Sequence, residues 1–445
     1  MELHGWSSEH ARLAGELAQR IAEHFQPPAP LGRTPSALDV ADLAAVTPAG
    51  IGVDAALALV DDVLLPNNVA LDHEAFFAYI QAAPATTAAL FDALVGAWSF
   101  CAESWQEAGA AVAAENAALA WLANIAGLPP STAGCFVSGG SAGNFNGLAV
   151  ARDEWRRRHG DTGRLAIAAS PSAHASVRRA AALLDLVVVE VEPDERGRLT
   201  GPALRRHADD TPICAVVASA GATNTGAIDD LAAIADACAE RDWWLHVDAA
   251  YGGGALCVPE LAQRFAGIEH ADSLVVDPHK WLFAPLDCAA ILYRRPAAAA
   301  ATHRQHADYL DAFGNEHTNP SDLAFHLTRR ARGLPLWFAL VVHGTDAFAD
   351  GVRAGVEVAH RTAAMVREIG PPLRLIMEPE LSVVLFERDG WTRSDWDRWA
   401  SAALADGLAF VAPTTWQARP AGRLAFIHPG ADLDVVGQLL ARAAG

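Results

Sequence analysis

The fold is decided by two stretches, Trp244-Leu-His-Val-Asp-Ala-Ala-Tyr-Gly-Gly-Gly254 and Ser273-Leu-Val-Val-Asp-Pro-His-Lys-Trp-Leu-Phe-Ala-Pro-Leu-Asp-Cys288. Each begins with a short apolar run, which is typical of a strand buried on both faces of a parallel sheet. Asp248 ends the first run, and Lys280 follows the second. Because ligands bind beyond the carboxyl ends of the strands in such sheets, we expect these two side chains at a binding site.

A lysine on a small, mostly apolar segment, after a strand-end aspartate, is the pair that pyridoxal 5'-phosphate (PLP) chemistry needs. The amine of Lys280 would condense with the aldehyde of the cofactor. The carboxylate of Asp248 would pair with the pyridinium nitrogen and keep it protonated, so that the ring acts as an electron sink. A single lysine is usually a solvated surface charge. Its position relative to Asp248, His279 and Trp281 favours cofactor binding.

Around these stretches, helical patterns alternate with short apolar runs from about residue 69 to 345. This alternation predicts an α/β fold with a mostly parallel sheet that helices cover on both faces. The expected helices are 86–99, 108–126, 143–158, 175–183 and 229–241. The expected strands are 135–137, 165–168, 186–190, 213–217, 244–247, 273–276 and 289–293.

Two further units flank this region, so we expect boundaries at 1–68, 69–345 and 346–445. Residues 1–68 form an N-terminal helical extension, with helices near 7–25 and 52–64. It is too small to bury its own core, so it should pack on the rest of the chain or on a partner subunit. The last segment is a smaller α/β unit. Its expected elements are helices at 347–369 and 394–405 and strands at 373–377, 382–387, 408–412 and 422–427.

Composition excludes several classes of protein. The 33 basic and 53 acidic residues give a formal charge of -20, which argues against binding to nucleic acid or anionic membranes. Six cysteines without a CxxC pair or a metal-ligand cluster indicate reduced thiols in a cytoplasmic protein without a metal site. The N-terminus lacks the pattern of a signal peptide, and no apolar run is long enough to span a membrane.

Several other polar residues follow expected strands. Gly139-Gly-Ser-Ala-Gly143 opens a helix, where backbone N–H groups and the hydroxyl of Ser141 could hold a phosphate. His174 could stack on the cofactor ring and contact the substrate carboxylate, although a lone histidine is usually structural. Ser219 to Gly226 suits close approach to a ring, but it is equally consistent with an ordinary turn. His279 could bond the phosphate or support the lysine.

At this point the chain resembles the group II PLP-dependent amino-acid decarboxylases, which include aromatic L-amino-acid, tyrosine, histidine and glutamate decarboxylases. The resemblance runs from the segment Asp72 to Ile80 to the segment Arg423 to Pro429. Its most specific parts are His246-Val-Asp-Ala-Ala-Tyr251 and Pro278-His-Lys-Trp281. Tryptophan directly after the lysine favours this group over aminotransferases and shorter archaeal-type decarboxylases.

The resemblance implies a PLP-dependent transferase-like fold of type I and an obligate homodimer with active sites at the subunit interface. Lys280 would form the internal aldimine, Asp248 would pair with the pyridine nitrogen, and His174 and Ala250 would cover the two ring faces. The remaining implied cofactor contacts are Gly140, Ser141 and His279 near the phosphate and Thr223 near the ring. Arg423 matches an arginine that serves the substrate carboxylate in some members, although a surface ion pair would explain it equally well.

The implied reaction is decarboxylation of an L-amino acid to its amine and CO2 through the Lys280 aldimine. The mobile loop of the family usually carries a tyrosine that reprotonates Cα, but residues 311–326 contain none. His317 or His326 could replace that acid. In members where the loop tyrosine is phenylalanine, oxygen can react with the intermediate and an aldehyde forms. An aldehyde-forming oxidative decarboxylase, or another PLP lyase, is therefore the alternative. A non-catalytic PLP-fold binding protein is a third possibility.

Two further departures from the family lie near the cofactor. Ala222 stands where threonine is common, with Thr223 adjacent, and Asp277 stands where many members have asparagine near the phosphate. A carboxylate facing a phosphate is unfavourable, so we expect Asp277 to point elsewhere. His246 would lie deeper in the sheet than the ligand and is expected to be structural.

Substrate identity is only weakly indicated by the sequence. Residues 69–130 contain one histidine, His73, and no Lys or Arg, which argues against an acidic substrate. Many aromatic residues in the same region suggest an apolar pocket for aromatic L-amino acids, although ordinary packing would explain each one. The candidates are Phe76, Phe77, Tyr79, Trp98, Phe100 and Trp105. His317 and Arg423 complete the candidate substrate residues.

Overall fold

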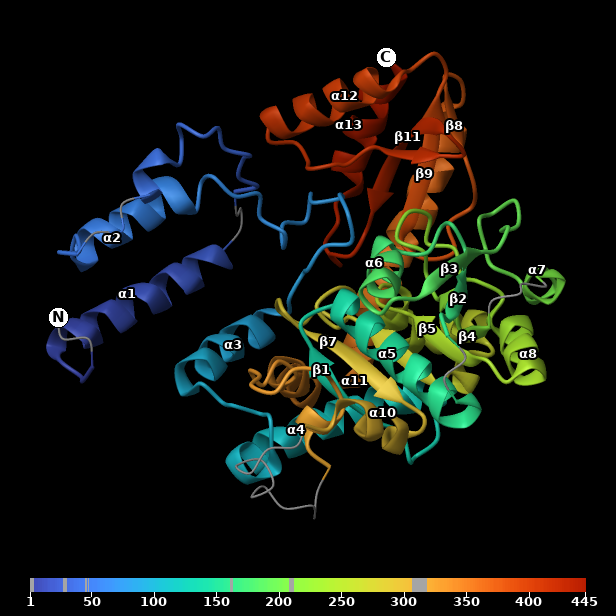
Figure 1. Cartoon of the computed structure of the whole chain (residues 1–445). Helices are drawn as coiled ribbons and strands as arrows, with labels where there is room; N and C mark the ends of the chain where they lie inside the picture. Colours follow the sequence, from blue (N-terminus) through green and yellow to red (C-terminus); the bar gives the residue numbers. More distant parts are fainter. Residues whose placement is uncertain are drawn as a thin grey trace.

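A computed structural model describes residues 4–26, 30–44, 46, 48–160, 163–207, 212–305 and 318–445. A large unit is built around a seven-stranded sheet, and the red C-terminal part of the chain forms a second unit on one side of it (Figure 1). The first two helices lie apart from the large sheet, at the left of the view. The α/β fold expected from the alternating pattern is therefore confirmed.

The large sheet has the strand order β1-β7-β6-β5-β4-β2-β3. Strands β6, β5, β4, β2 and β3 run parallel to one another, whereas β7 is antiparallel to both of its neighbours, β6 and β1. The sheet is thus mostly parallel, as expected. Its strands are β1 Ala133–Val137, β2 Ala166–Ala169, β3 Val187–Glu190, β4 Ile213–Ser219, β5 Trp244–Asp248, β6 Ser273–Val276 and β7 Ala289–Tyr293.

Side chains alternate between the two faces of these strands, so the sheet separates two apolar cores. Phe136 belongs to one core, and its neighbours Cys135 and Val137 belong to the other. The first core is covered by α3 Thr86–Trp98, α4 Trp105–Ile125, α7 Gly201–Arg206, α8 Leu231–Arg241 and the first part of α11 Leu334–Ile369. The second is covered by α5 Gly140–His159, α6 Ala175–Leu183 and α10 Pro296–His303.

The C-terminal unit has a four-stranded antiparallel sheet in the order β10-β11-β9-β8. Its elements are β8 Leu373–Leu375, β9 Val383–Arg388, α12 Arg393–Ala405, β10 Thr414–Trp416, β11 Arg419–Ala425 and α13 Leu433–Ala444. Helix α11 connects the units and is non-helical at Gly344 (φ 72°), so the proposed boundary at 345/346 falls inside it. The strand expected at 408–412 was wrong, because only Phe410 pairs there, in a single bridge with Phe76.

The N-terminal segment contains α1 Ser8–His24, α2 Val53–Leu59 and a π-helical turn at Val60–Leu64. None of the residues of α1, all of which the structure describes, is buried. Helix α1 lies beside α2 (Figure 1) and is joined to that segment by the ion pairs Arg12–Asp54 and Arg20–Asp61. Shorter helical turns are Ala41–Ala44, Gly252–Cys257, Pro259–Ala262, Gln263–Phe265, Ile268–His270 and Pro320–Asp322.

Among the helices in the described part of the chain, none is both long enough and apolar enough to cross a membrane.

Candidate active site

A cavity of about 210 Å³ lies at the carboxyl ends of the parallel strands. Asp248 ends β5, Ser219 ends β4, and Lys280 follows β6, so their side chains reach the same edge of the sheet. All eight residues that the sequence assigned to the cofactor line this cavity: Gly140, Ser141, His174, Thr223, Asp248, Ala250, His279 and Lys280. The sequence did not indicate that Asn144, Ser176 and Tyr251 also line it.

The amine of Lys280 lies at one end of the cavity, beside Asp277. Its Nζ is 2.9 Å from Asp277 Oδ2, and the N–H of Gly140 donates to the same oxygen at 3.1 Å. The prediction that Asp277 points elsewhere was therefore wrong. An ammonium and a backbone N–H compensate its negative charge, so a buried carboxylate is tolerated next to an anion site. Asp277 Oδ1 is buried without a hydrogen-bond partner in the described structure.

His279 lies beside the same carboxylate, with Nε2 at 3.6 Å from Asp277 Oδ2. Its other nitrogen, Nδ1, accepts a hydrogen bond from the N–H of Cys288 at 3.0 Å. A backbone N–H can only donate, so the neutral ring carries its proton on Nε2. Burial lowers the pKa of His279 below its ordinary value, which favours this neutral form. The imidazole therefore offers an N–H at the Asp277 end of the cavity.

The N-terminus of the 20-residue helix α5 forms the adjacent wall of the cavity. Gly139 is its N-cap and has no side chain to accept from the first helical N–H groups. A Cβ on Gly140 would lie 2.9 Å from Asp277 Oδ2 and 3.0 Å from Ala250 Cβ, so only glycine leaves the cavity open here. A helix N-terminus of this kind attracts a phosphate through its N–H groups and its dipole.

Asp248 lines the same cavity, and both of its carboxylate oxygens accept hydrogen bonds. Asn144 Nδ2 donates to Oδ2 at 2.8 Å, and the N–H of Ala250 donates to Oδ1 at 3.1 Å. These two N–H donors hold the carboxylate in one orientation. The side chain is mostly buried, so the site presents a fixed negative charge to whatever group binds beside it.

These residues fit PLP by the chemistry of the donor set. The amine of Lys280 matches the aldehyde, the carboxylate of Asp248 matches a protonated ring nitrogen, and the start of α5 matches the phosphate. The comparisons agree, because residues 53–388 match the pyridoxal-dependent decarboxylase conserved domain. This chain belongs to that family.

The sequence of this decarboxylase is similar to the sequences of several relatives over most of its length. It is 34% identical to an L-2,4-diaminobutyrate decarboxylase of Rhizobium meliloti, over 90% of this chain and 83% of that protein. It is 31% identical to an aromatic-L-amino-acid decarboxylase of Bacillus atrophaeus, over 71% and 68%. Its fold matches the structure of Oryza sativa TDC with PLP and tryptamine, with a TM-score of 0.92 over 99% and 98% of the two chains at 23% identity.

The chain is therefore a PLP-dependent carboxy-lyase of fold type I that acts on an amino acid. The expected cofactor and fold are confirmed. Family membership does not support the third possibility, a non-catalytic binding protein, and the lysine and aspartate of the cavity are both present. The substrate and the product need separate arguments.

The decarboxylase does not bring its candidate aromatic residues to the cavity of the same chain. Phe77 is buried in the core of the C-terminal unit, where it contacts Phe426 at a ring distance of 5.3 Å, so packing accounts for it. Tyr79 and Trp98 are 59% and 63% exposed. Trp98 and Phe100 stack on each other with nearly parallel rings. The aromatic cluster is thus largely a surface of the protomer.

Arg423 of the decarboxylase is buried on β11 and does not line the cavity. Its Nη2 donates to the carbonyl of Thr223 at 2.6 Å, and Nε donates to the carbonyl of Asn224 at 3.3 Å. Burial lowers its pKa to about 10. The alternative of a surface ion pair was therefore wrong, and the guanidinium supports the turn that carries Thr223 into the cavity.

The two histidines considered as acids differ in what the structure shows. His317 and the nearby Tyr309 lie outside the described residues. His326 does not line the cavity, and burial together with Arg329 and Arg332 lowers its pKa to about 4. A histidine with that pKa carries no extra proton at neutral pH, so His326 is a poor general acid in this chain.

Proposed function

We propose that this cavity removes the carboxylate of an L-amino acid whose side chain carries no negative charge, with aromatic amino acids favoured. The observation that supports it most is the placement of Lys280 and Asp248 in one cavity that the N-terminus of α5 also lines. PLP, when bound, supplies the sink for the electron pair that remains when CO2 leaves. The product is then the amine.

Each residue of the cavity has a role in this proposal. Lys280 binds the cofactor covalently, and its Nζ carries protons to and from the reacting carbon. Asp248, held in one orientation by two N–H donors, would pair with the protonated ring nitrogen. His174 and Ala250 cover the two faces of the ring. The phosphate is assigned to Gly140, Ser141 and His279, and the ring edge to Thr223.

Asp277 holds Lys280 in place before the cofactor binds. The 2.9 Å contact between Nζ and Oδ2 keeps the long side chain over the cavity, so less conformational entropy remains to be lost later. Asp277 also anchors Gly140, the first helical residue of α5. One carboxylate therefore positions both the amine and the phosphate end of the site.

A buried cation is available for the substrate carboxylate. Arg423 has no carboxylate partner among the residues that the structure describes, and it lies directly behind the turn of Thr223. A buried unpaired charge is costly, which favours an anion in its neighbourhood. We therefore keep Arg423 as the candidate that attracts this group from behind the turn of Thr223.

The exposed aromatic residues and helix α1 support a homodimer. Tyr79 and Trp98 are large apolar side chains that lie open in a single chain, and α1 presents Leu13, Leu17 and Ile21 on one face without burying them. Exposed apolar surface of this kind marks an interface. We propose that a second copy covers it and that the aromatic cluster lines the partner's cavity. Free cysteines throughout support the cytoplasm as the location.

A diamino acid is the second candidate substrate. Cys101, Glu103 and Glu107 bring their ligand atoms within 4.8 Å of one another, in the stretch of sequence that contains the candidate aromatic residues. Glu103 is buried and accepts from the thiol of Cys101. Such an acidic cluster would suit the ammonium of a diamino side chain. The aldehyde-forming reaction remains an alternative for the product, because residues 311–326 contain no tyrosine.

The product of the purified protein tests these assignments. PLP-loaded protein is given aromatic, diamino and acidic L-amino acids separately in air, and products are identified by mass spectrometry while peroxide is monitored. An amine from aromatic substrates without peroxide is the expected result. An amine from 2,4-diaminobutyrate alone would transfer the assignment to the acidic cluster, and aldehyde with peroxide would replace the proposed product. Lys280→Ala is the control for background chemistry.

A further inference from the structure

A chain of buried polar side chains runs from the far end of β5 to the cavity. Trp244 Nε1 donates to Ser273 Oγ at 2.7 Å, and Ser273 Oγ lies 2.7 Å from His246 Nδ1. His246 Nε2 lies 2.9 Å from Asn144 Oδ1. Asn144 Nδ2 then donates to Asp248 Oδ2 at 2.8 Å. Trp244, Ser273, His246 and Asn144 are all at most 1% exposed, so these bonds are shielded from water.

A branch of the same chain reaches His174. Asn144 Nδ2 donates to Ser176 Oγ at 2.9 Å, and Ser176 Oγ lies 2.8 Å from His174 Nδ1. The backbone N–H of Ser176 donates to the same Nδ1 at 3.2 Å. One amide therefore contacts both the residue assigned to the ring nitrogen and, through a hydroxyl, the residue assigned to the ring face.

With His246 neutral, because burial lowers its pKa to about 4, one arrangement of hydrogens satisfies every bond in this network. Indole N–H can only donate, so Ser273 accepts from Trp244 and its hydroxyl is free to donate to His246 Nδ1. A neutral His246 can then carry its proton on Nε2 and donate to Asn144 Oδ1. The carboxylate of Asp248 can only accept, which independently turns the NH2 group of Asn144 toward it. Asn144 Oδ1 therefore faces His246 Nε2 and accepts from it, so Nδ1 of the neutral ring accepts from Ser273, which is consistent with the bond from Trp244.

The branch to His174 independently requires the same orientation of the Asn144 amide. A backbone N–H can only donate, so His174 Nδ1 is an acceptor, and the hydroxyl of Ser176 must donate to it. The oxygen of Ser176 is then an acceptor for the NH2 group of Asn144. The neutral ring of His174 consequently carries its proton on Nε2, and this tautomer is fixed by residues behind it.

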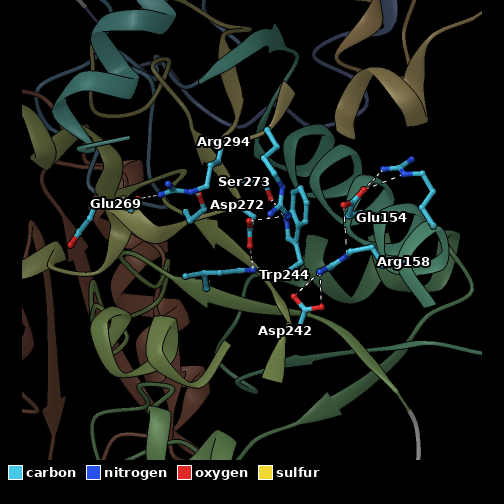
Figure 2. A network of polar contacts seen from close by, with 12 residues as sticks. Glu154, Arg158, Asp242, Trp244, Glu269, Asp272, Ser273 and Arg294 are labelled. Atoms are coloured by element: carbon cyan, nitrogen blue, oxygen red, sulfur yellow. Dashed lines mark hydrogen bonds and ion pairs between the residues drawn. The ribbon is translucent and has the colours of Figure 1, made fainter. Parts of the chain in front are cut away.

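The outer end of the network is anchored by charged residues at the start of β5 and β6. Figure 2 shows Trp244 and Ser273 beside Asp272, near the ion pair of Arg158 and Asp242. Asp272 Oδ2 accepts from the N–H of Leu245, the residue after Trp244, at 3.0 Å. The guanidinium of Arg295 lies 5.3 Å from the centre of the Trp244 ring. The indole is thus held in a fixed position.

Helix α5 is shaped to fit the central imidazole. A Cβ on Gly147 would lie 2.5 Å from His246 Cε1 and 2.6 Å from Nδ1, so glycine is needed for the ring to lie here. Gly140, Asn144 and Gly147 recur at helical spacing and face the sheet together. The same helix face therefore supplies the phosphate cradle, the amide of the network and the space for the imidazole.

We propose that Asn144 and His246 are positioning residues for the reaction, which together fix the Asp248 carboxylate and the His174 ring in the orientations that the cofactor requires. This inference rests on the proposed function of those two residues. Neither Asn144 nor His246 is assigned to the reacting atoms. Their effect passes through Asp248, and it should appear in cofactor binding as well as in turnover.

The test compares two variants of equal shape, His246→Gln and His246→Met. Glutamine keeps an N–H near the position of Nε2, and methionine removes it. We expect His246→Met to weaken PLP binding and lower kcat by about 10- to 100-fold, as residues that orient a site from behind commonly do, with KM little changed. His246→Gln should recover most of the loss. The dissociation constant of PLP and the absorbance of the bound cofactor are measured together with turnover.

The inference would be overturned if the two variants had the same kcat and the same PLP affinity, whether both matched the wild type or both fell. The N–H at the position of Nε2 would then have no effect of its own. If His246→Met does not fold, Asn144→Asp is tested in its place. This variant keeps the shape of the side chain but places an oxygen, which cannot donate, next to the carboxylate of Asp248. PLP affinity should fall by at least about tenfold, and wild-type affinity would reject the inference. Asp248→Ala, measured in parallel, tests the proposed role of Asp248 separately from the positioning role of Asn144 and His246. If that variant binds PLP as the wild type does, the role of Asp248 itself is wrong.

Discussion

Lys280 combines two properties that are hard to obtain together, a half-buried position and freedom to react. It is paired with Asp277 at 2.9 Å, and its side chain is 21% exposed, so the amine is held at the cavity without being enclosed. The N–H of Gly140 donates to the same carboxylate of Asp277 and not to Nζ, and His279 Nδ1 accepts from Cys288, so neither group occupies the amine. A lysine in this setting can exchange its partner when the cofactor arrives.

The first prediction concerns this amine. Borohydride reduction of PLP-loaded wild-type protein should attach the cofactor covalently at the peptide that contains Lys280. Lys280→Ala should lose this attachment completely and lose more than about 99% of turnover, because no other lysine lies in the chain and an arginine cannot substitute. Peptide mass spectrometry after reduction checks the result. Cofactor fixed to Lys280→Ala protein would contradict the assignment.

The second prediction follows from buried neutral histidines. Burial lowers the pKa of His246 to about 4, whereas the unfolded side chain titrates near 6.5. Because the pKa is lower in the folded state, the contribution of the neutral ring to the free energy of unfolding is complete above pH 6.5. It is lost as the pH falls toward 4. The shift corresponds to roughly 3 kcal/mol at most for this residue. His303 and His326, also with a pKa lowered to about 4, should act in the same direction.

Urea unfolding at a series of pH values checks this expectation. The midpoint of the wild type should fall steadily between about pH 6.5 and pH 4.5. His246→Gln, which cannot titrate, should show a smaller decrease over the same range. If the two proteins lose stability in parallel, the imidazole of His246 does not contribute to the pH dependence, and carboxylates would account for it.

The chemistry of the cavity could be inferred at this scale because it depends on residue types at strand ends. Asp248 and Lys280 stood out since each follows a short apolar run, and the cavity contains both. Asn144 could not be inferred in the same way. It lies inside a helix, and its contacts to His246 and Asp248 exist only after β5 and α5 pack together. Asp277 was misjudged because a lone carboxylate near a phosphate is unfavourable, whereas Lys280 and the N–H of Gly140 compensate it.

At the scale of elements, α5 determines how the site is assembled. Its N-terminus forms a wall of the cavity, and its body packs on the central strands of the sheet. Gly143 and Gly147 are both placed where a Cβ would overlap with the sheet, against Val275 and His246 respectively. The close approach of helix and sheet is therefore a property of this helix face, and the network depends on it.

The third prediction tests this approach. In Gly147→Ala, the new Cβ would meet the imidazole of His246 at 2.5 Å, and that ring is held by two hydrogen bonds and cannot move freely. The free energy of unfolding should fall by about 1–3 kcal/mol, the usual cost of overpacking. Gly15→Ala in α1 is the matched control, because nothing lies within 4 Å of its Cβ. It should leave stability unchanged or raise it. Equal effects of both variants would mean that α5 has room to adjust.

The strands of the large sheet lie close to the residues expected from the sequence, whereas the elements of the C-terminal unit agree less well with those expected. Strands β6 and β7 have the same bounds as the apolar runs that predicted them. Each is buried on both faces and therefore needs a continuous apolar segment. The segment 408–412 is just as apolar, but it pairs only through Phe410 and packs beside Phe76. The elements expected from the sequence end at residue 427, so helix α13 was missed although its apolar residues recur at helical spacing. Burial of Val436, Leu439 and Leu440 stabilises it.

At the scale of the whole molecule, the two sheets and their helices form closed cores, whereas the N-terminal segment does not. Helix α1 buries none of its residues and is attached through ion pairs at its surface, including His24 with Asp72. Surface ion pairs contribute little to stability, so they cannot by themselves explain why this helix is ordered. A second subunit that covers the apolar face would supply the missing burial. The sequence suggested this only because 1–68 is too short to form a core.

The fourth prediction places a charge on that face. Leu17→Glu should weaken dimerisation by at least about tenfold, because burying a leucine contributes about 1.5–3 kcal/mol and burying a glutamate costs free energy. Specific activity should then fall on dilution, since aromatic residues of one subunit are proposed to complete the cavity of the other. Ala22→Glu, with the same charge on another face of α1, should change neither. Sedimentation velocity across a concentration series measures the association. A Leu17→Glu protein that sediments as the wild type does at every concentration would show that α1 lies outside the interface.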